Sequence, residues 1–350
     1  MEAFEIIVTI YMVLFIALLF TGFPIAWILG GMSLLFAVAG IYLSQLGIDT
    51  FLLDSWADFA IIVDRIWAQV QNWLLVALPM FIFMGLMLDR SGVAEHMMTN
   101  FVRLFGRLRG GLALTVVLIG ILLAASTGIV GASVVLLALL SIPMMMQARY
   151  SKELATGVVA ASGTLGILIP PSIMLVIMAD QLSLSTGDLF MGAMFPGLML
   201  GGFYAIYVIA VGIFNPKAAP PPTDVEPFTP KLVLDAVIAV LPAFGLILAV
   251  LGTIFFGIAT PTEAAGVGAF GATLLAALNR RLNYAMLRET CIQTMRTTGF
   301  ILAIFVGATA FSVVMRSLGG DEFIYHMLKG LPFGPTGIVI FILFIAFLAG

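Results

Sequence analysis

One apolar run in this sequence cannot form a single continuous helix. It extends from about Leu154 to Met178 and is long enough to cross a bilayer, for which about 20 residues suffice. Pro170 and Pro171 interrupt it, because proline has no N–H to donate one turn back and pushes the preceding residue towards an extended backbone. The pattern predicts a broken span over residues 154–178. Its unpaired carbonyls are tolerated inside a membrane only where protein or water satisfies them.

The composition predicts an all-α polytopic membrane protein. Of the 350 residues, 62% are hydrophobic and only 9% are charged, whereas soluble domains carry roughly 25% charged residues. The net charge of −3 argues against a nucleic-acid partner. The single cysteine, Cys291, excludes an internal disulfide. His96 and His326 lack ligand spacing, so we expect no cofactor and no transition-metal site.

A second unusual segment covers residues 110–148. Two apolar pieces, 110–125 and 129–146, are separated by small and polar residues. Basic residues lie on both sides of the segment, and basic loops favour the cytoplasm, so both ends should lie on that side (Arg90, Arg103, Arg107, Arg109, Arg149, Lys152). The pattern predicts a helical hairpin with its tip near residues 126–133. Two ordinary antiparallel spans are the alternative.

Residues 50–72 differ in character from the apolar runs around them. Polar residues recur there at helical spacing and would lie on one face (Asp54, Asp58, Arg65, Gln69, Asn72). This predicts a helix that lies in the membrane interface. A polar stripe packed against a partner subunit is the alternative. Further along, the proline-rich segment 216–230 predicts an exposed linker.

The linker divides the chain into two parts, 1–215 and 231–350, whose elements recur in similar order. Pro24 and Pro261 each open a helix after a preceding span, and a glycine follows seven residues later in both parts. The second part then shows an interfacial-type helix over 284–297, a span over 298–315 and a turn at 319–322. We interpret the two parts as repeats. Inverted repeats are typical of secondary transporters.

The second repeat is incomplete when it is compared with the first. It lacks counterparts of the second hairpin arm and of the broken span. We therefore expect that this chain is truncated at its C-terminus. From the spacing of the repeat, the complete protein would be longer than this chain by roughly 70 to 90 residues.

Residues 260–263 form a second specific motif, Thr-Pro-Thr-Glu. Thr260 suits the N-cap of a helix, Pro261 its first position, and Glu263 the position whose side chain returns to the N-cap, which together make a capping box. An acid near the membrane is also a candidate for a proton relay, which is the alternative for Glu263.

Two motifs carry a resemblance to a known family. These are Gly163-Thr164-Leu165-Gly166-Ile167-Leu168-Ile169-Pro170-Pro171-Ser172-Ile173 and Ala259-Thr260-Pro261-Thr262-Glu263-Ala264-Ala265. With the order of elements, they resemble the large membrane (permease) subunit of tripartite ATP-independent periplasmic (TRAP) transporters. The resemblance implies an elevator-type inverted-repeat transporter with two hairpins and two broken spans. It also implies a bacterial inner-membrane location and uptake of an organic carboxylate anion by sodium symport.

The partners implied by this resemblance are a small four-helix membrane subunit and a periplasmic substrate-binding protein. The first sodium site would combine the hairpin tip with the bend. It would use backbone atoms around Gly131, Gly166 and Ile169. Three hydroxyl groups would be the candidate side-chain ligands (Ser133, Thr164, Ser172). The break in the span would depend on three further residues (Gly163, Pro170, Pro171). Many family members have Ser-Gly-Ser at the tip, whereas this chain has Val-Gly-Ala-Ser over residues 130–133. No basic residue lies in this site, so a carboxylate would depend on helix dipoles and hydroxyl groups.

Two other classes of function remain as alternatives. An intramembrane enzyme of the hydrolase type would need paired carboxylates or a nucleophile–base pair at membrane depth, but Asp180 and Asp188 fall at the end of a predicted span. A structural membrane scaffold is the second alternative, and the polar hairpin tip argues against it.

Overall fold

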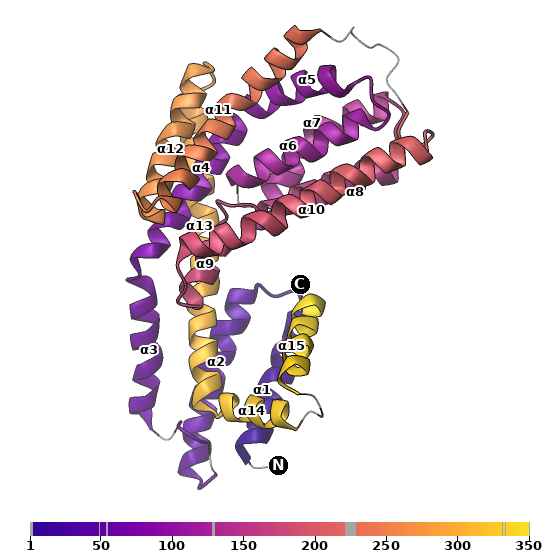
Figure 1. The fold of residues 1–350 in the computed structure, drawn as a ribbon. Helices are drawn as coiled ribbons and strands as arrows, with labels where there is room; N and C mark the ends of the chain where they lie inside the picture. The colour runs from indigo at the N-terminus through magenta and orange to yellow at the C-terminus, as the bar shows by residue number, and fades with distance from the viewer. Residues whose placement is uncertain are drawn as a thin grey trace. The chain divides into compact units, whose positions relative to one another are not determined.

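A computed structural model of the chain describes residues 3–48, 50–53, 55–127, 130–220, 229–330, 332 and 334–349 (Figure 1). Within those residues it contains fifteen α-helices and two short 3-10 helices, and it contains no strand there. Five helical segments are long and apolar enough to cross a membrane (Ile25–Gln45, Trp73–Arg90, Thr186–Phe214, Pro230–Phe255, Tyr284–Ser317). The prediction of an all-α polytopic membrane protein is confirmed.

The helices form two compact units, which are described separately. The first unit contains residues 1–72 and 299–350. Its elements are α1 (Ala3–Leu19), α2 (Ile25–Gln45), α3 (Trp56–Val70), the later part of α13 (Tyr284–Ser317), α14 (Gly320–Lys329) and α15 (Pro335–Ala349). Tyr11 of α1 lies at the centre of its core and stacks on Phe311 of α13, with 4.5 Å between ring centroids. Gly307 allows α13 to approach α2 closely, since a Cβ atom there would lie 2.9 Å from the carbonyl oxygen of Ala26.

The second unit contains residues 73–298. Its elements are η1 (Trp73–Val76), α4 (Ala77–Arg90), α5 (Val93–Phe105), α6 (Gly111–Thr127), α7 (Val130–Gln147), α8 (Lys152–Thr164), η2 (Leu165–Ile167), α9 (Ile173–Gln181), α10 (Thr186–Phe214), α11 (Pro230–Phe255), α12 (Pro261–Leu278) and the first part of α13. The core of this unit includes large buried side chains of α4, such as Leu78, Phe81 and Met87. The face of α12 that packs on α4 consists largely of small residues, so the two helices approach closely (Ala264, Ala265, Gly268, Ala272).

The segment that we predicted as an interfacial helix, residues 50–72, contains α3. Ser55 caps this helix, and its backbone N–H donates to Oδ2 of Asp58 over 2.8 Å. Asp54, which was assigned to the polar face, lies outside the described residues. The position of α3 relative to a membrane stays a prediction.

Two details of the predicted helix pattern are wrong. Residues 284–297 and 298–315 are not separate elements but parts of the continuous helix α13. A change from polar to apolar residues suggests a boundary there. The one residue at this boundary that disfavours a helix is Gly299, and a single glycine reduces the stability of a helix by about 1 kcal/mol without ending it. The turn predicted at 319–322 is the start of α14: Gly319 caps it with φ +85°, and two acids occupy its favourable first turn (Asp321, Glu322).

The predicted pattern lacks helix α5, because the arginines in and around it indicate a loop. Its apolar residues nevertheless recur at helical spacing, and four of them are buried (Val93, Ala94, Met97, Met98). The linker predicted at 216–230 cannot be assessed over residues 221–228, which lie outside the described part of the chain. Pro230, its last residue, is the first residue of α11. The interpretation of residues 1–215 and 231–350 as repeats rests on the order of their elements, and it stays a prediction.

Candidate functional site

The bend in the broken span lies between α8 and α9. Helix α8 ends at Thr164, one short 3-10 turn follows, and α9 begins at Ile173. In a continuous helix the carbonyl of Ile167 would accept a hydrogen bond from residue 171, but Pro171 has no N–H. The Ser172 hydroxyl takes its place and donates to the Ile167 carbonyl over 2.8 Å. A side chain therefore satisfies one of the carbonyls that the prolines release.

The other predicted residues of the bend differ in exposure. Gly166, Ile169 and Ser172 are buried, and so are both prolines. Thr164 is exposed, and its hydroxyl donates to the carbonyl of Ala161 in its own helix over 2.8 Å. The proton of the Thr164 hydroxyl is therefore engaged within α8, while its oxygen lone pairs remain available.

The start of α7 lies against the end of α8. A Cβ atom on Gly163 would lie 3.0 Å from Cα and 3.1 Å from the backbone nitrogen of Val134, so glycine is the residue that permits this approach. Gly131 and Ser133 belong to the first turn of α7. Ser133 is buried, whereas Gly131 is exposed, with nothing within 4 Å of a Cβ atom placed on it. The fold therefore brings the start of α7 to the bend, although residues 128 and 129 lie outside the described part.

Helix α10 supports the bend from another side, which the sequence analysis did not anticipate. A Cβ atom on Gly197 would lie 2.9 Å from Cγ1 of Ile169 and 3.3 Å from the carbonyl oxygen of Leu168. One turn later, a Cβ atom on Gly201 would lie 2.8 Å from Cδ1 of Ile121 in α6. The signal in the sequence was the spacing of four between two glycines, which places both on one face of a helix.

The electrostatics of this region come from the backbone rather than from charged side chains. The bend joins the C-terminal end of α8 to the N-terminal end of α9, where Ser172 occupies the N-cap position without a side-chain hydrogen bond to the helix. Carbonyls at a helix C-terminus favour a cation, and N–H groups at a helix N-terminus favour an anion. Helix ends of both kinds therefore meet at the bend, and the start of α7 adds another N-terminus beside α8. This arrangement suits a cation together with a carboxylate.

The Thr-Pro-Thr-Glu motif lies at the start of α12. Thr260 is the N-cap and Pro261 the first helical residue. The backbone N–H and the hydroxyl of Thr260 each lie 2.8 Å from Oε2 of Glu263, while the backbone N–H of Glu263 donates to the Thr260 hydroxyl over 3.3 Å. The hydrogen bonds from Thr260 lower the pKa of the Glu263 carboxyl, because they stabilise its ionised form. Glu263 thus has a partner for its charge within the cap.

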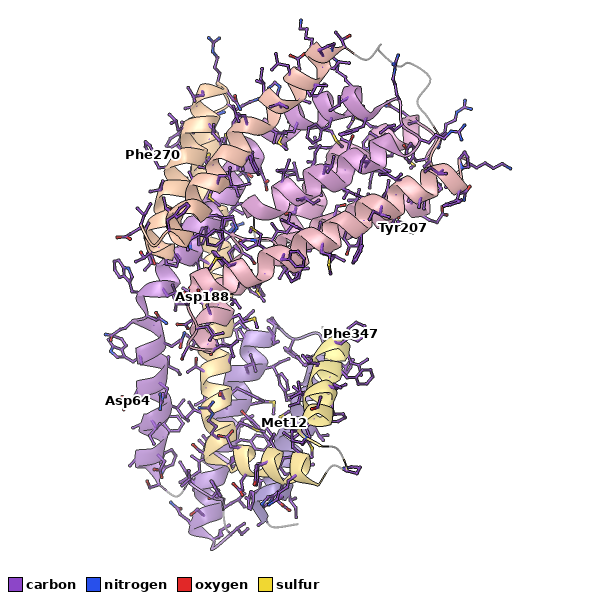
Figure 2. All side chains as sticks on the ribbon, in the orientation of Figure 1. Met12, Asp64, Asp188, Tyr207, Phe270 and Phe347 are labelled. Atoms are coloured by element: carbon purple, nitrogen blue, oxygen red, sulfur yellow. The ribbon has the colours of Figure 1, made fainter. Side chains whose placement is uncertain are left out.

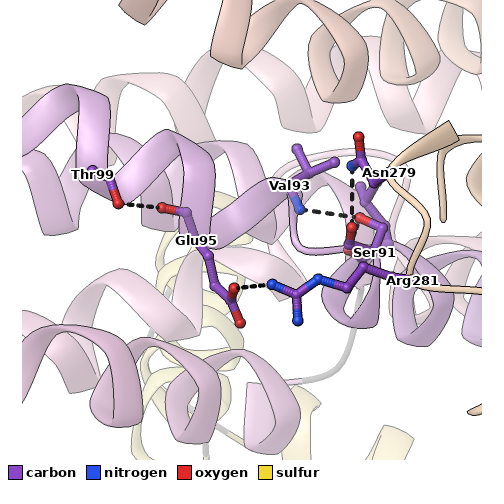
Figure 3. Close-up of polar contacts among 7 residues, drawn as sticks. Ser91, Val93, Glu95, Thr99, Asn279 and Arg281 are labelled. Atoms are coloured by element: carbon purple, nitrogen blue, oxygen red, sulfur yellow. Dashed lines mark hydrogen bonds and ion pairs between the residues drawn. The ribbon is translucent and has the colours of Figure 1, made fainter.

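A polar corner joins two connections that are far apart in the sequence (Figure 3). The side-chain amide of Asn279, after α12, donates to the backbone carbonyl of Ser91 between α4 and α5 over 3.1 Å. Nearby, the guanidinium of Arg281 lies 2.9 Å from the carboxylate of Glu95. These pairs could not be predicted from the sequence, because nothing in the local pattern relates residues so far apart.

Comparison with known proteins identifies the family. The family model described as "Tripartite ATP-independent periplasmic transporter, DctM component" matches residues 12–350. The C4-dicarboxylate TRAP transporter large permease protein DctM of Vibrio cholerae is 36% identical over 268 residues, which is 75% of this chain and 54% of that protein. Its namesake from Rhodobacter capsulatus is 30% identical over 321 residues, covering 87% of this chain and 69% of that protein.

Another relative is the ectoine/5-hydroxyectoine TRAP transporter large permease protein UehC of Ruegeria pomeroyi. It is 28% identical over 339 residues, which cover 96% of this chain and 74% of that protein. The matched part of this chain thus spans about half of the Vibrio protein and about three quarters of the Ruegeria protein. These matches exclude the intramembrane enzyme, because the family is a family of transporter permeases. This chain belongs to the DctM family of TRAP transporter large permeases.

Proposed function

We propose that this permease imports an organic acid anion by sodium symport. It works in the bacterial inner membrane with a small four-helix membrane subunit and a periplasmic substrate-binding protein, which delivers the substrate. The relatives named for C4-dicarboxylates, 2,3-diketo-L-gulonate and ectoine support a small solute that carries a carboxylate. A permease from Oleidesulfovibrio alaskensis that is named DctMQ for isethionate supports a membrane partner, and an anionic substrate more generally.

The observation that carries this proposal is the approach of the start of α7 to the bend at Gly163. Sodium would bind oxygen atoms of the backbone around Gly131, Gly166 and Ile169, as broken helices of transporters bind their coupling ions. Three hydroxyl groups are the candidate side-chain ligands (Ser133, Thr164, Ser172). Ser172 is the strongest of them, because it donates its proton to the Ile167 carbonyl and keeps oxygen lone pairs for a cation.

The substrate carboxylate would bind next to the cation. The N-terminal ends of α7 and α9 supply partial positive charge, so no basic side chain is needed. A bound sodium ion adds to this charge, and sodium and substrate would therefore each strengthen the binding of the other.

The ion site can be tested without knowing the substrate. We expect sodium chloride, compared with potassium chloride at equal ionic strength, to raise the unfolding temperature of the purified permease, because a ligand stabilises the state that binds it. Ser172→Ala should raise the half-saturating sodium concentration at least fivefold. Ser141→Ala is the matched control, because that buried hydroxyl also donates to a backbone carbonyl, at Leu137, but lies further along α7. Equal stabilisation by potassium, or an unchanged sodium response in the Ser172 variant, would contradict the site.

Coupling is tested in proteoliposomes that contain the permease and both partners. The solute probe is whichever of succinate, 2,3-diketogulonate and ectoine the purified binding protein retains in equilibrium dialysis. Uptake of that radiolabelled solute should rise when sodium is higher outside than inside, and should fall when both sides are equal. Uptake that is indifferent to the gradient would exclude sodium symport.

A further inference from the structure

A long groove lies between α8 and α10. Its volume is about 790 Å³, and Val117 of α6 contributes to its wall. The lining from α8 includes Leu154, Gly157 and Val158, and the lining from α10 includes Phe203 and four further residues that recur at helical spacing (Tyr204, Tyr207, Val211, Phe214). The groove therefore follows one face of each helix and is apolar along most of its length.

The groove faces outward along a helix that is long enough to span a membrane. Helix α10 is one of the five such segments, and three aromatic residues of the groove are exposed on it (Phe203, Tyr207, Phe214; Tyr207 is labelled in Figure 2). In a bilayer, an exposed apolar groove of this kind meets acyl chains rather than water. Its body therefore suits a hydrocarbon chain.

One end of the groove is polar. Ser151, Glu153, Asn215 and Ala218 line it there, and the backbone N–H of Ser151 donates to the carbonyl of Ala218 over 3.0 Å. This hydrogen bond holds the segment before α8 against the segment after α10. The polar end is therefore built from two chain segments that meet.

Basic residues gather around the polar end. Lys152 follows Ser151 directly and Lys217 precedes Ala218, and both lysines are exposed. Arg149 is exposed two residues before Ser151, and the backbone of Arg109 lies against α10 at Gly212. Glu153 is the acid that lines the groove, so these neighbouring basic residues outnumber it. The basic residues also predict that this end faces the cytoplasm.

We propose that this groove binds one anionic phospholipid from the cytoplasmic leaflet. Its acyl chain lies along α8 and α10, and its phosphate lies near Lys152 and Lys217. The apolar body selects a lipid, and the basic end selects an anionic headgroup, as basic pockets between transmembrane helices do. The proposal is independent of sodium coupling and of the transported solute.

A steric test uses two glycines in the same unit. Gly157 lines the groove, Gly192 lies elsewhere on α10, and at both positions nothing lies within 4 Å of a Cβ atom, so both tolerate a larger side chain. The purified full-length gene product is titrated with dioleoyl-phosphatidylglycerol or dioleoyl-phosphatidylcholine, and bound lipid is counted by native mass spectrometry. We expect one phosphatidylglycerol per chain. Gly157→Leu should weaken its binding at least fivefold, and Gly192→Leu should leave binding unchanged.

A second test, which removes positive charge, separates the contribution of the headgroup to lipid binding from that of the acyl chain. Each basic residue near a membrane surface contributes about fivefold to the binding of an anionic lipid. The double substitution Lys152→Gln with Lys217→Gln should therefore reduce the preference for phosphatidylglycerol over phosphatidylcholine at least tenfold, without reducing the binding of phosphatidylcholine. The control pair, Lys231→Gln with Arg288→Gln, removes two exposed cations whose sequence neighbours do not line the groove.

Three results would overturn the proposal. Equal binding of the two lipids would exclude headgroup selection. Unchanged binding in Gly157→Leu would place the lipid elsewhere on the protein. The absence of any bound lipid on the correctly folded, unsubstituted protein would show that the groove is not a lipid site.

Discussion

Gly163 determines how closely α7 can approach the end of α8. The residue is buried, and a methyl group on it would point at the backbone of Val134. Gly131, in the first turn of α7, has open space at the same atom. Gly163 of the break and Gly131 of the proposed ion site therefore differ in purpose, since the first allows helix contact and the second leaves the backbone accessible.

At the residue scale, we expect Gly163→Ala to destabilise the permease by about 1 to 3 kcal/mol, as overpacking of a tight contact does. Gly131→Ala is the matched variant and should be neutral or slightly stabilising, because alanine favours a helix over glycine. The unfolding midpoint of each detergent-solubilised variant measures both effects. Equal midpoints for the two variants would show that the contact between α7 and α8 is looser than described here.

Polar contacts at the ends of helices join different elements of the second unit. At the polar corner of Figure 3, Asn279 and Ser91 are bonded although 188 residues separate them. Arg90, at the end of α4, lies 2.8 Å from the side-chain amide oxygen of Gln293 in α13. These contacts connect the end of α4 to segments from the second half of the chain.

At the element scale, the two contacts of the corner should differ in strength. Asn279→Ala leaves the carbonyl of buried Ser91 without this donor and should cost about 1 kcal/mol. Arg281→Gln should cost under about 0.5 kcal/mol, because each side chain of the Arg281–Glu95 pair is 54% exposed and exposed ion pairs contribute little. Chemical denaturation in detergent measures both variants. A larger loss for Arg281→Gln would show that the ion pair, rather than the amide, holds the corner.

For the whole molecule, the break between α8 and α9 is held by packing against α7 and α10 and by the hydrogen bond from the Ser172 hydroxyl to the Ile167 carbonyl. Apolar side chains on other helices project outward, as the labelled Phe270 and Phe347 do in Figure 2. The exposed fractions of these two residues are 72% and 79%. Such exposure is expected of a surface that faces lipid or a partner subunit.

At this scale, replacing Pro170 and Pro171 with alanine should allow α8 and α9 to merge and should reduce solute uptake in proteoliposomes at least tenfold. The helical signal in circular dichroism should not fall, which distinguishes loss of transport from unfolding. Pro143→Ala is the control, since Pro143 lies inside α7 and does not form the bend. Transport that survives the double substitution would show that the bend is purely architectural.

Several features of the fold follow from local physical chemistry and could be predicted from the sequence. Prolines end helices, and the break at Pro170 is of this kind. The capping box at Thr260 was predictable because three residues suffice to form it. Helix α13 was divided wrongly, because a change in polarity along a helix resembles a boundary although no residue there breaks the helix.

By itself the sequence determined a helical membrane protein with a broken span, since proline chemistry and apolar length act locally. It also pointed to the family, because two long motifs carried the resemblance. Only the tertiary structure decided which residues meet: Val134 at Gly163, Gly197 at Ile169, and Asn279 at Ser91. The physical reason is that such contacts depend on the distance between backbones in space, which no local pattern of side chains specifies.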